Sequence, residues 1–171
     1  MITNALFAGL PTDWRCPACS RARAQIPRVG STNAEVAKAV EHHDHIKEYT
    51  NASMRDKFGS DWVTKVPAGI GEHLNRIERF VVGFAPTVVC EDCNNAEAKA
   101  KQIVGAPKFF TFAPSEIRRF ISGAPSRKHE VDPALAATVY SESKARYVMR
   151  IAVAERLYAE ALAGNLWITI R

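Results

Sequence analysis

Four cysteines in two CxxC pairs are the residues of this chain with the clearest chemistry. Cys16 and Cys19 lie in WRCPACSR, and Cys90 and Cys93 lie in VVCEDCNNAEAKAK. Two such pairs with no cysteine left over are typical of one zinc ion bound by four thiolates. Two unrelated pairs of thiols are the alternative, and a redox or chaperone protein is a weaker one. We therefore expect a structural zinc ion.

A second group of residues could hold a different metal ion. Segment 42–45 reads HHDH and lies between the cysteine pairs, and Asn94 directly follows the second pair. Hard divalent cations prefer oxygen ligands, which Asp44 and the side chain of Asn94 both offer. His45 follows Asp44, and a histidine side chain can act as a general base near neutral pH. Zinc would then hold the fold, and a second metal would act in phosphodiester hydrolysis.

The two segments HHDHI and CEDCNNAEAKAK together resemble the HNH, or ββα-metal, nucleases. They are most similar to the recombination endonuclease VII branch, which carries CxxC, then HxDH, then CxxCN with a glutamate three residues after the asparagine. Lys101 also falls where that branch has a lysine. The similarity covers the cysteine pairs, the histidine cluster and one helix, a minority of the chain, but its motifs are specific in combination.

The resemblance implies a role for each matching residue. Asp44 and Asn94 would ligate a catalytic Mg²⁺ or Mn²⁺ ion, and His45 would activate the attacking water. His42 would contact the scissile phosphate or the leaving group, and Glu97 would support the site. The four cysteines would bind structural zinc. His43 falls where the family varies, so it receives no role.

One predicted helix face supports this site. Asn94, Glu97 and Lys101 lie at i, i+3 and i+7, so they share a face, and the zinc beside Asn94 would fix its position. Glu97 could instead be a surface carboxylate that pairs with Lys101 at i+4. Asp44 and His45 could likewise belong to an exposed polar turn.

The length of 171 residues is enough for a sizeable core, and one domain over 1–171 is the default. We predict an α+β fold in which the zinc site holds together a ββα-metal core. An N-terminal arm at 1–13 precedes this core. An insertion at 47–84 lengthens its ββ hairpin, and a mainly helical part at 113–171 follows it.

Local patterns predict the elements that position these residues. A β-branched run predicts a strand over 87–89, and a helix over 94–104 follows it. The capping-box pattern Thr32-Asn33-Ala34-Glu35 favours a short helix or turn, with a strand after it near 40–46, although Val36, Ala37, Val40 and the histidines that follow could equally form a strand. The other predictions are a helical turn at 53–58, an amphipathic helix at 70–82, an aromatic strand at 109–112, a helix at 113–121, a long helix from Pro133 toward Ala163, and a final strand at 166–170.

The net charge of +5 is unevenly distributed. From Lys99 to Arg150 there are ten Lys or Arg and four Asp or Glu, so this segment carries +6 and the rest −1. A basic segment after a candidate catalytic site suits a phosphate backbone, although a solvated helix surface is also basic. The candidate DNA contacts are Lys99, Lys101, Arg118, Arg119, Arg127 and Lys128. Arg15, Arg21, Arg23, His73 and His129 are expected simply to lie at the surface.

These inferences predict a metal-dependent DNA endonuclease, of the restriction type on duplex DNA and acting as a homodimer. A Holliday-junction or branched-DNA resolving endonuclease is the nearest alternative. A zinc-containing DNA-binding module without catalysis is another. The N-terminus lacks a basic region before its short apolar stretch, and no apolar run could span a bilayer. We therefore expect a cytoplasmic protein without a membrane partner.

Overall fold

The computed structural model describes residues 1–65 and 70–165, and the chain divides into two compact units. Unit 1 comprises Met1–Asp44 and Phe84–Glu142, and unit 2 comprises His45–Gly83 and Ser143–Arg171. Unit 1 combines strands and helices, so the predicted α+β class is confirmed. The first segment of unit 2 nearly coincides with the insertion predicted at 47–84. One nuclease domain over the whole chain stays a prediction.

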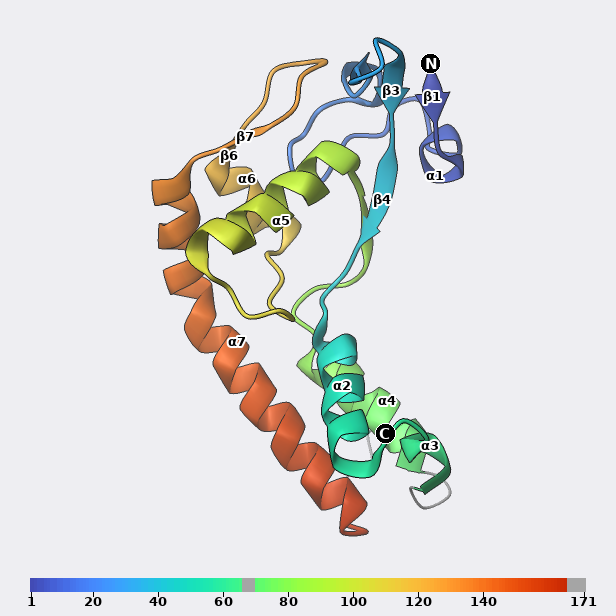
Figure 1. Cartoon of the computed structure of the whole chain (residues 1–171), viewed down its shortest axis with the longest axis vertical. Helices are drawn as coiled ribbons and strands as arrows, with labels where there is room; N and C mark the ends of the chain where they lie inside the picture. The colour runs from blue at the N-terminus through green and yellow to red at the C-terminus, as the bar shows by residue number, and fades with distance from the viewer. Residues whose placement is uncertain (66–69, 166–171) are drawn as a thin grey trace. The chain divides into compact units, whose positions relative to one another are not determined.

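A ββα arrangement forms the centre of unit 1. Strands β4 (Ala39–His42) and β5 (Thr87–Cys90) pair antiparallel, with Ala39 opposite Cys90. Helix α5 (Glu91–Val104) follows β5 directly and packs against both strands (Figure 1). The second cysteine pair therefore lies where the strand passes into the helix.

The structure confirms the strand and the helix predicted on either side of this junction. Helix α5 begins at Glu91, three residues earlier than predicted. It ends at Val104, and the residue that follows, Gly105, has a φ of 60°, a left-handed conformation that favours glycine. Glu91 and Asp92 lie in its first turn, where negative charge is favourable.

The rest of unit 1 consists of short elements around this centre. Strands β1 (Ile2–Thr3), β2 (Arg28–Val29) and β3 (Glu35–Ala37) form a sheet in the order β1-β3-β2. The other elements are α1 (Ala5–Ala8), the 3-10 turn η1 (Arg23–Gln25), α6 (Pro114–Phe120) and the antiparallel pair β6 (Ile121–Ser122) and β7 (Glu130–Val131). Residues 1–13, predicted as an arm, contribute β1 and α1, and the helix predicted over 113–121 is confirmed as α6.

Two predictions of local structure in unit 1 have different outcomes. The short helix or turn predicted at 32–35 is a turn between β2 and β3, in which Asn33 has a φ of 56°, and the alternative of a strand at Val36 and Ala37 is confirmed by β3. The strand predicted at 109–112 is wrong, because the Phe110 N–H donates to the Pro107 carbonyl and the Phe112 backbone bonds to the side chains of His42 and Glu97. Phe110 and Phe112 are nonetheless fully buried and pack edge to face. Their apolar character was therefore a signal of core position rather than of strand pairing.

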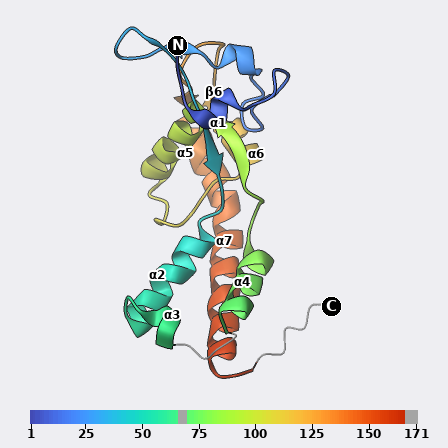
Figure 2. The ribbon, with the colours of Figure 1, turned by 90° about the vertical axis from the view of Figure 1, so that its right-hand side faces the viewer.

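Unit 2 is helical. It contains α2 (Ile46–Phe58), α3 (Trp62–Lys65) and α4 (Ile70–Val81). It also contains the later part of α7, a helix that spans Pro133–Leu162; Figure 2 shows all four helices. The core residues of unit 2 are Ile46, Met54, Ile70, Leu74, Ile77, Val81, Ala154, Tyr158 and Ala161.

The helices predicted at 70–82 and from Pro133 are confirmed as α4 and α7. The helical turn predicted at 53–58 is the end of the longer α2. The predicted strand at 166–170 lies outside the described residues. Within the described part of the chain, every helix is too short or too polar to cross a lipid bilayer.

Candidate functional site

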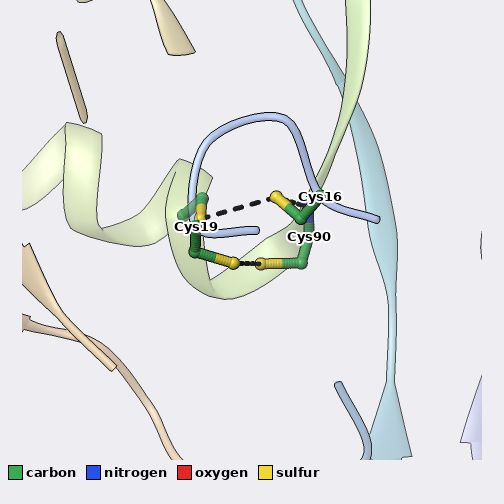
Figure 3. Close-up of side chains that lie close together, drawn as sticks. Cys16, Cys19 and Cys90 are labelled. Atoms are coloured by element: carbon green, nitrogen blue, oxygen red, sulfur yellow. Dashed lines mark hydrogen bonds between the residues drawn. The ribbon is translucent and has the colours of Figure 1, made fainter. Parts of the chain in front are cut away.

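The four cysteines converge on one point in unit 1 (Figure 3). Their sulfur atoms lie within 4.8 Å of one another, with 3.7 Å between Cys16 and Cys93 and 3.8 Å between Cys19 and Cys90. Sulfur atoms bound tetrahedrally to one zinc ion lie about 3.8 Å apart. The four cysteines could therefore hold a metal ion such as zinc, as predicted.

Local backbone structure positions each cysteine pair. The first pair lies in a tight turn, residues 16–21, which we call the first knuckle. In it Ser20 N–H donates to the Cys16 carbonyl and Cys16 N–H to the Arg21 carbonyl, at 2.8 and 3.0 Å. The second pair lies at the end of β5 and in the first turn of α5. Cys90 N–H points at Cys16 Sγ, 3.4 Å away, so the two pairs also contact each other directly.

The close approach of the sulfur atoms changes their acidity. Hydrogen bonds from the other thiols, that of Cys16 first, strongly lower the pKa of Cys19. Hydrogen bonds to the other sulfur atoms, again Cys16 first, together with burial raise the pKa of Cys93. Four thiolates this close repel one another, and a shared dication would allow all of them to ionise.

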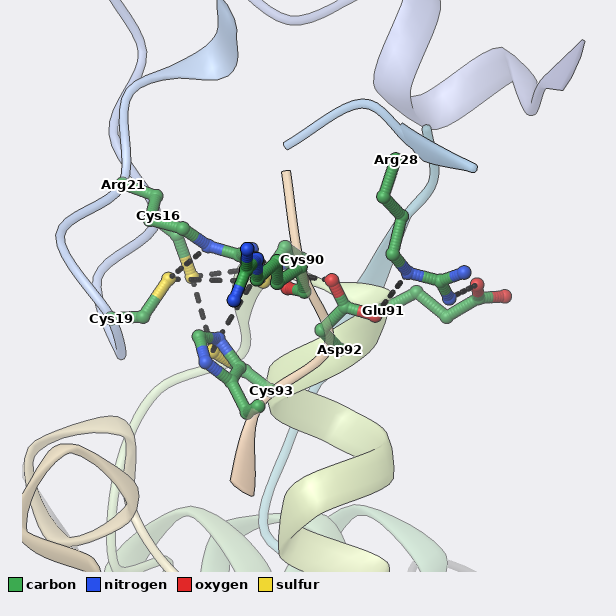
Figure 4. Close-up of polar contacts among 10 residues, drawn as sticks. Cys16, Cys19, Arg21, Arg28, Cys90, Glu91, Asp92 and Cys93 are labelled. Carbon is green, nitrogen blue, oxygen red and sulfur yellow. Dashed lines mark hydrogen bonds and ion pairs between the residues drawn. The ribbon is translucent and has the colours of Figure 1, made fainter. Parts of the chain in front are cut away.

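A buried ion-pair network surrounds the sulfur atoms (Figure 4). Arg21 donates through Nη2 to Cys90 Sγ (3.2 Å) and Asp92 Oδ2 (3.0 Å), and through Nε to Cys19 Sγ (3.4 Å). Asp92 also accepts from Arg28 Nε at 2.7 Å. The expectation of a surface position for Arg21 is wrong, because the residue is only 5% exposed. Its guanidinium would offset the negative charge of a four-thiolate centre.

His129 also contacts the sulfur cluster, although it was expected at the surface. Its Nε2 lies 3.3 Å from Cys93 Sγ and 3.1 Å from Arg21 Nη2, and its ring is half-buried. Burial lowers the pKa of His129, but hydrogen bonds to Cys19 and Cys90 dominate and raise it to about 9. His129 belongs to no sequence motif. It contacts the sulfur cluster because the folded chain returns there just before β7, and no local pattern in the sequence indicates this.

The residues predicted to bind a catalytic metal lie near the end of β4 and in the first turns of α5. Asp44 is 7% exposed, and Asn94, the fourth residue of α5, is half-buried. A hydrogen-bonding interaction links Asn94 to His42, at the end of β4. The strand predicted near 40–46 stops at His42, and His45 is the N-cap residue of α2. Binding of one ion by Asp44 and Asn94 stays a prediction.

Two other predicted site residues hold the backbone of Phe112. His42 Nε2 donates to the Phe112 carbonyl at 2.8 Å, and Phe112 N–H donates to Glu97 Oε1 at 3.3 Å. His42 is 3% exposed, and its ring stacks on Phe84. Burial lowers the pKa of His42, so its neutral form is favoured. Both side chains therefore have a structural role that the resemblance does not include.

Glu97 pairs with Lys101, as the alternative interpretation expected, but it is not a surface residue. Its Oε1 lies 3.7 Å from Lys101 Nζ, and the residue is 5% exposed. Burial raises the pKa of Glu97, while Lys101 and the Phe112 N–H oppose the shift. Of the three residues predicted to share a helix face, Asn94, Glu97 and Lys101, Glu97 therefore points into the interior.

We expect alanine at position 97 or 42 to destabilise unit 1 through Phe112. Glu97→Ala would leave a buried N–H without an acceptor, which costs roughly 1–3 kcal/mol. His42→Ala would also remove the stacked ring and cost roughly 2–4 kcal/mol. Urea denaturation measures both losses. Glu41→Ala is the control, because that side chain is 67% exposed and its loss should change stability by under about 0.5 kcal/mol.

Three of the six candidate DNA contacts have partners within the chain. Arg118 donates to the carbonyls of Ala18 (3.0 Å) and Pro17 (2.7 Å), so it holds the first knuckle. Arg119 forms a two-bond ion pair with Glu142, at 2.5 and 2.9 Å. Lys101 pairs with Glu97, as described above. The other three, Lys99, Arg127 and Lys128, are exposed and show no ion pair among the described residues.

Comparisons with protein-family models, curated proteins and solved structures find no match to this chain. Within residues 1–65 and 70–165, the four cysteines are the group of three or more His, Cys, Asp or Glu side chains that converges closely enough to share a metal ion.

Proposed function

We propose that this protein is a metal-dependent DNA endonuclease of the HNH type, in which zinc bound by the four cysteines holds the ββα core. The observation that carries the proposal is the position of the sulfur cluster. It joins the first knuckle to the junction between β5 and α5, and Asn94 is the next residue after Cys93. The zinc ion would thus fix the position of Asn94, which is a proposed ligand of the second metal ion.

In this proposal Asp44 and Asn94 hold a Mg²⁺ or Mn²⁺ ion through their side-chain oxygens. That ion would stabilise negative charge on the phosphate and on the leaving oxygen. His45 accepts the proton of the attacking water. His42 and Glu97 hold the Phe112 backbone, and His42 also interacts with Asn94, so both residues support the geometry of the site. His42 is also proposed to contact the phosphate or the leaving group.

The preferred substrate is duplex DNA, cut by a homodimer as restriction enzymes do. A two-fold symmetric protein matches two scissile bonds on opposite strands. The motif similarity favours a Holliday-junction or branched-DNA resolving enzyme as the second candidate. The cysteine cluster by itself would also suit a zinc-containing DNA-binding module without catalysis.

One experiment separates these functions. Purified protein is incubated with supercoiled plasmid, linear phage DNA and a four-way junction, each with and without Mg²⁺ or Mn²⁺, and the ends are sequenced. Discrete plasmid fragments mean a sequence-specific enzyme, and cuts confined to the junction mean a resolving enzyme. Binding without cutting under every condition would reject the nuclease in favour of the binding module. Native mass spectrometry of the same sample should find one zinc ion per chain.

A further inference from the structure

The β6–β7 hairpin carries an exposed loop, residues 123–129, which we call the basic loop. The hairpin itself has two residue pairs, Ile121 with Val131 and Ser122 with Glu130. A two-stranded ladder of this length is too short to be stable alone. The conformation of the basic loop must therefore depend on contacts with other parts of unit 1.

Two backbone contacts connect the basic loop to the region of the first knuckle. Arg21 Nη1 donates to the carbonyl of Arg127 at 2.8 Å, and Ser126 N–H donates to the carbonyl of Gln25 at 2.9 Å. The same Arg21 guanidinium donates to the sulfur atoms of Cys19 and Cys90. One side chain thus bonds both to the predicted metal ligands and to the backbone of the loop.

His129 makes the second connection, at the other end of the basic loop. Its Nε2 lies 3.3 Å from Cys93 Sγ and 3.1 Å from Arg21 Nη2. Gly123 lies against the ring so closely that a Cβ atom there would come within 2.1 Å of His129 Nδ1. The ring therefore fills the space between the glycine that opens the loop and the sulfur cluster.

The basic loop presents two adjacent cations to solvent. Arg127 and Lys128 are both exposed, and the described residues offer neither side chain an ion pair. Glu130 is the acidic residue nearest to them in the sequence, and it is also exposed. Neighbouring free cations on a loop with fixed backbone can contact phosphate oxygens at a small cost in side-chain ordering.

We propose that the metal bound by the four cysteines fixes the basic loop through Arg21 and His129, so that Arg127 and Lys128 contact the phosphate backbone of duplex DNA. The choice of DNA as partner rests on the proposed function. Metal-bound thiolates are acceptors with fixed positions, so the Arg21 and His129 N–H groups would hold the loop in one conformation. Because the same cluster adjoins Asn94, one metal would position both the substrate backbone and the proposed catalytic centre.

The link between cluster and loop is tested by hydrogen exchange on the zinc-loaded 171-residue chain. The amide of Ser126 is the reporter, because its N–H is bonded to Gln25. His129→Phe keeps a ring against Gly123 but removes the nitrogen that contacts Cys93 and Arg21. We expect the Ser126 amide to exchange at least tenfold faster in this variant, with one zinc still bound per chain. His129→Gln, which keeps an N–H donor, should restore part of the protection.

The contact with DNA is tested by Arg127→Glu combined with Lys128→Glu, in a binding assay without Mg²⁺ or Mn²⁺. We expect duplex affinity to fall on the order of tenfold or more at 0.1 M salt, and the slope of log affinity against log salt to shrink by about two. The Ser126 amide should exchange as in wild type. Arg55→Glu with Arg79→Glu, both exposed residues of unit 2, makes the same change in net charge and should cost less affinity.

The outcomes separate this inference from the proposed function. Unchanged exchange at Ser126 in both His129 variants, or equal losses of affinity in the two double variants, would overturn the inference even if the protein cuts DNA. If the His129 variants lose zinc, the Arg127 and Lys128 variant alone decides whether the loop contacts DNA. If both loop tests give the expected results but the protein never cuts DNA, the inference about the basic loop would hold and the proposed nuclease function would be wrong.

Discussion

Asp44→Asn should cut supercoiled plasmid about a thousandfold more slowly than wild type, with unchanged affinity for the uncut DNA. The substitution keeps the size of a side chain that is 7% exposed but removes the charge that would hold the catalytic ion. A thousandfold loss corresponds to about 4 kcal/mol of transition-state stabilisation, which is reasonable for a lost metal ligand. The measurement is the single-turnover rate over a range of Mg²⁺ and Mn²⁺ concentrations.

The matched control is Asp56→Asn, which makes the same chemical change at an exposed position on α2. It should cut at the wild-type rate. Asn94→Ala should resemble Asp44→Asn, because it removes the other proposed oxygen ligand. If Asp44→Asn cut as fast as its control, the assignment of a metal to Asp44 and Asn94 would be wrong, whatever the cysteines bind.

The features that the sequence predicts correctly are those with a local pattern. The four-cysteine metal site is predictable from the two CxxC pairs, because a short turn fixes the ligand spacing within each pair. The helix after Cys90 and the amphipathic helix α4 are predictable because their apolar and polar residues repeat with the helical period. Pro133 at the start of α7 is a similar local signal.

The features that the sequence misses depend on contacts between distant segments. Arg21 is adjacent to the first cysteine pair, yet its partners Asp92 and the Arg127 carbonyl come from two later parts of the chain. Arg118 was predicted to contact DNA, but it bonds to the carbonyls of the first knuckle about 100 residues earlier. A charge pattern alone does not distinguish an arginine that binds a carbonyl from one that faces solvent.

Local patterns are less decisive where a longer-range contact competes with them. The pattern at 32–35 allows a short helix or a turn, and the structure has a turn there because β3 begins at Glu35 and pairs with β1 and β2. The aromatic residues at 109–112 suit a strand, but the Phe112 backbone is bonded on both sides by His42 and Glu97. His42 and Glu97, which were predicted to act in catalysis, thus explain why no strand forms at 109–112.

Removal of the metal should unfold unit 1 and leave the helices of unit 2 largely formed. The strands of unit 1 are two to four residues long, and its centre holds the sulfur cluster with the buried ions Arg21 and Asp92. Zinc bound by four thiolates contributes on the order of 10 kcal/mol, about as much as the whole stability of a small domain. The core of unit 2 comes from apolar residues of α2, α4 and α7 and contains no cysteine.

This expectation is measured by hydrogen exchange before and after chelation, and in Cys93→Ser. The amides of α5 should lose protection by at least a hundredfold, whereas those of α4 should change little. Zinc added back should restore protection in the chelated wild type, and Mg²⁺ should not, since thiolates select soft or borderline metals. Protection of α5 that survived chelation would mean that packing around Phe110, Phe112 and Phe120 stabilises unit 1 without the metal. The anchoring of Asn94 by zinc would then lose its physical basis.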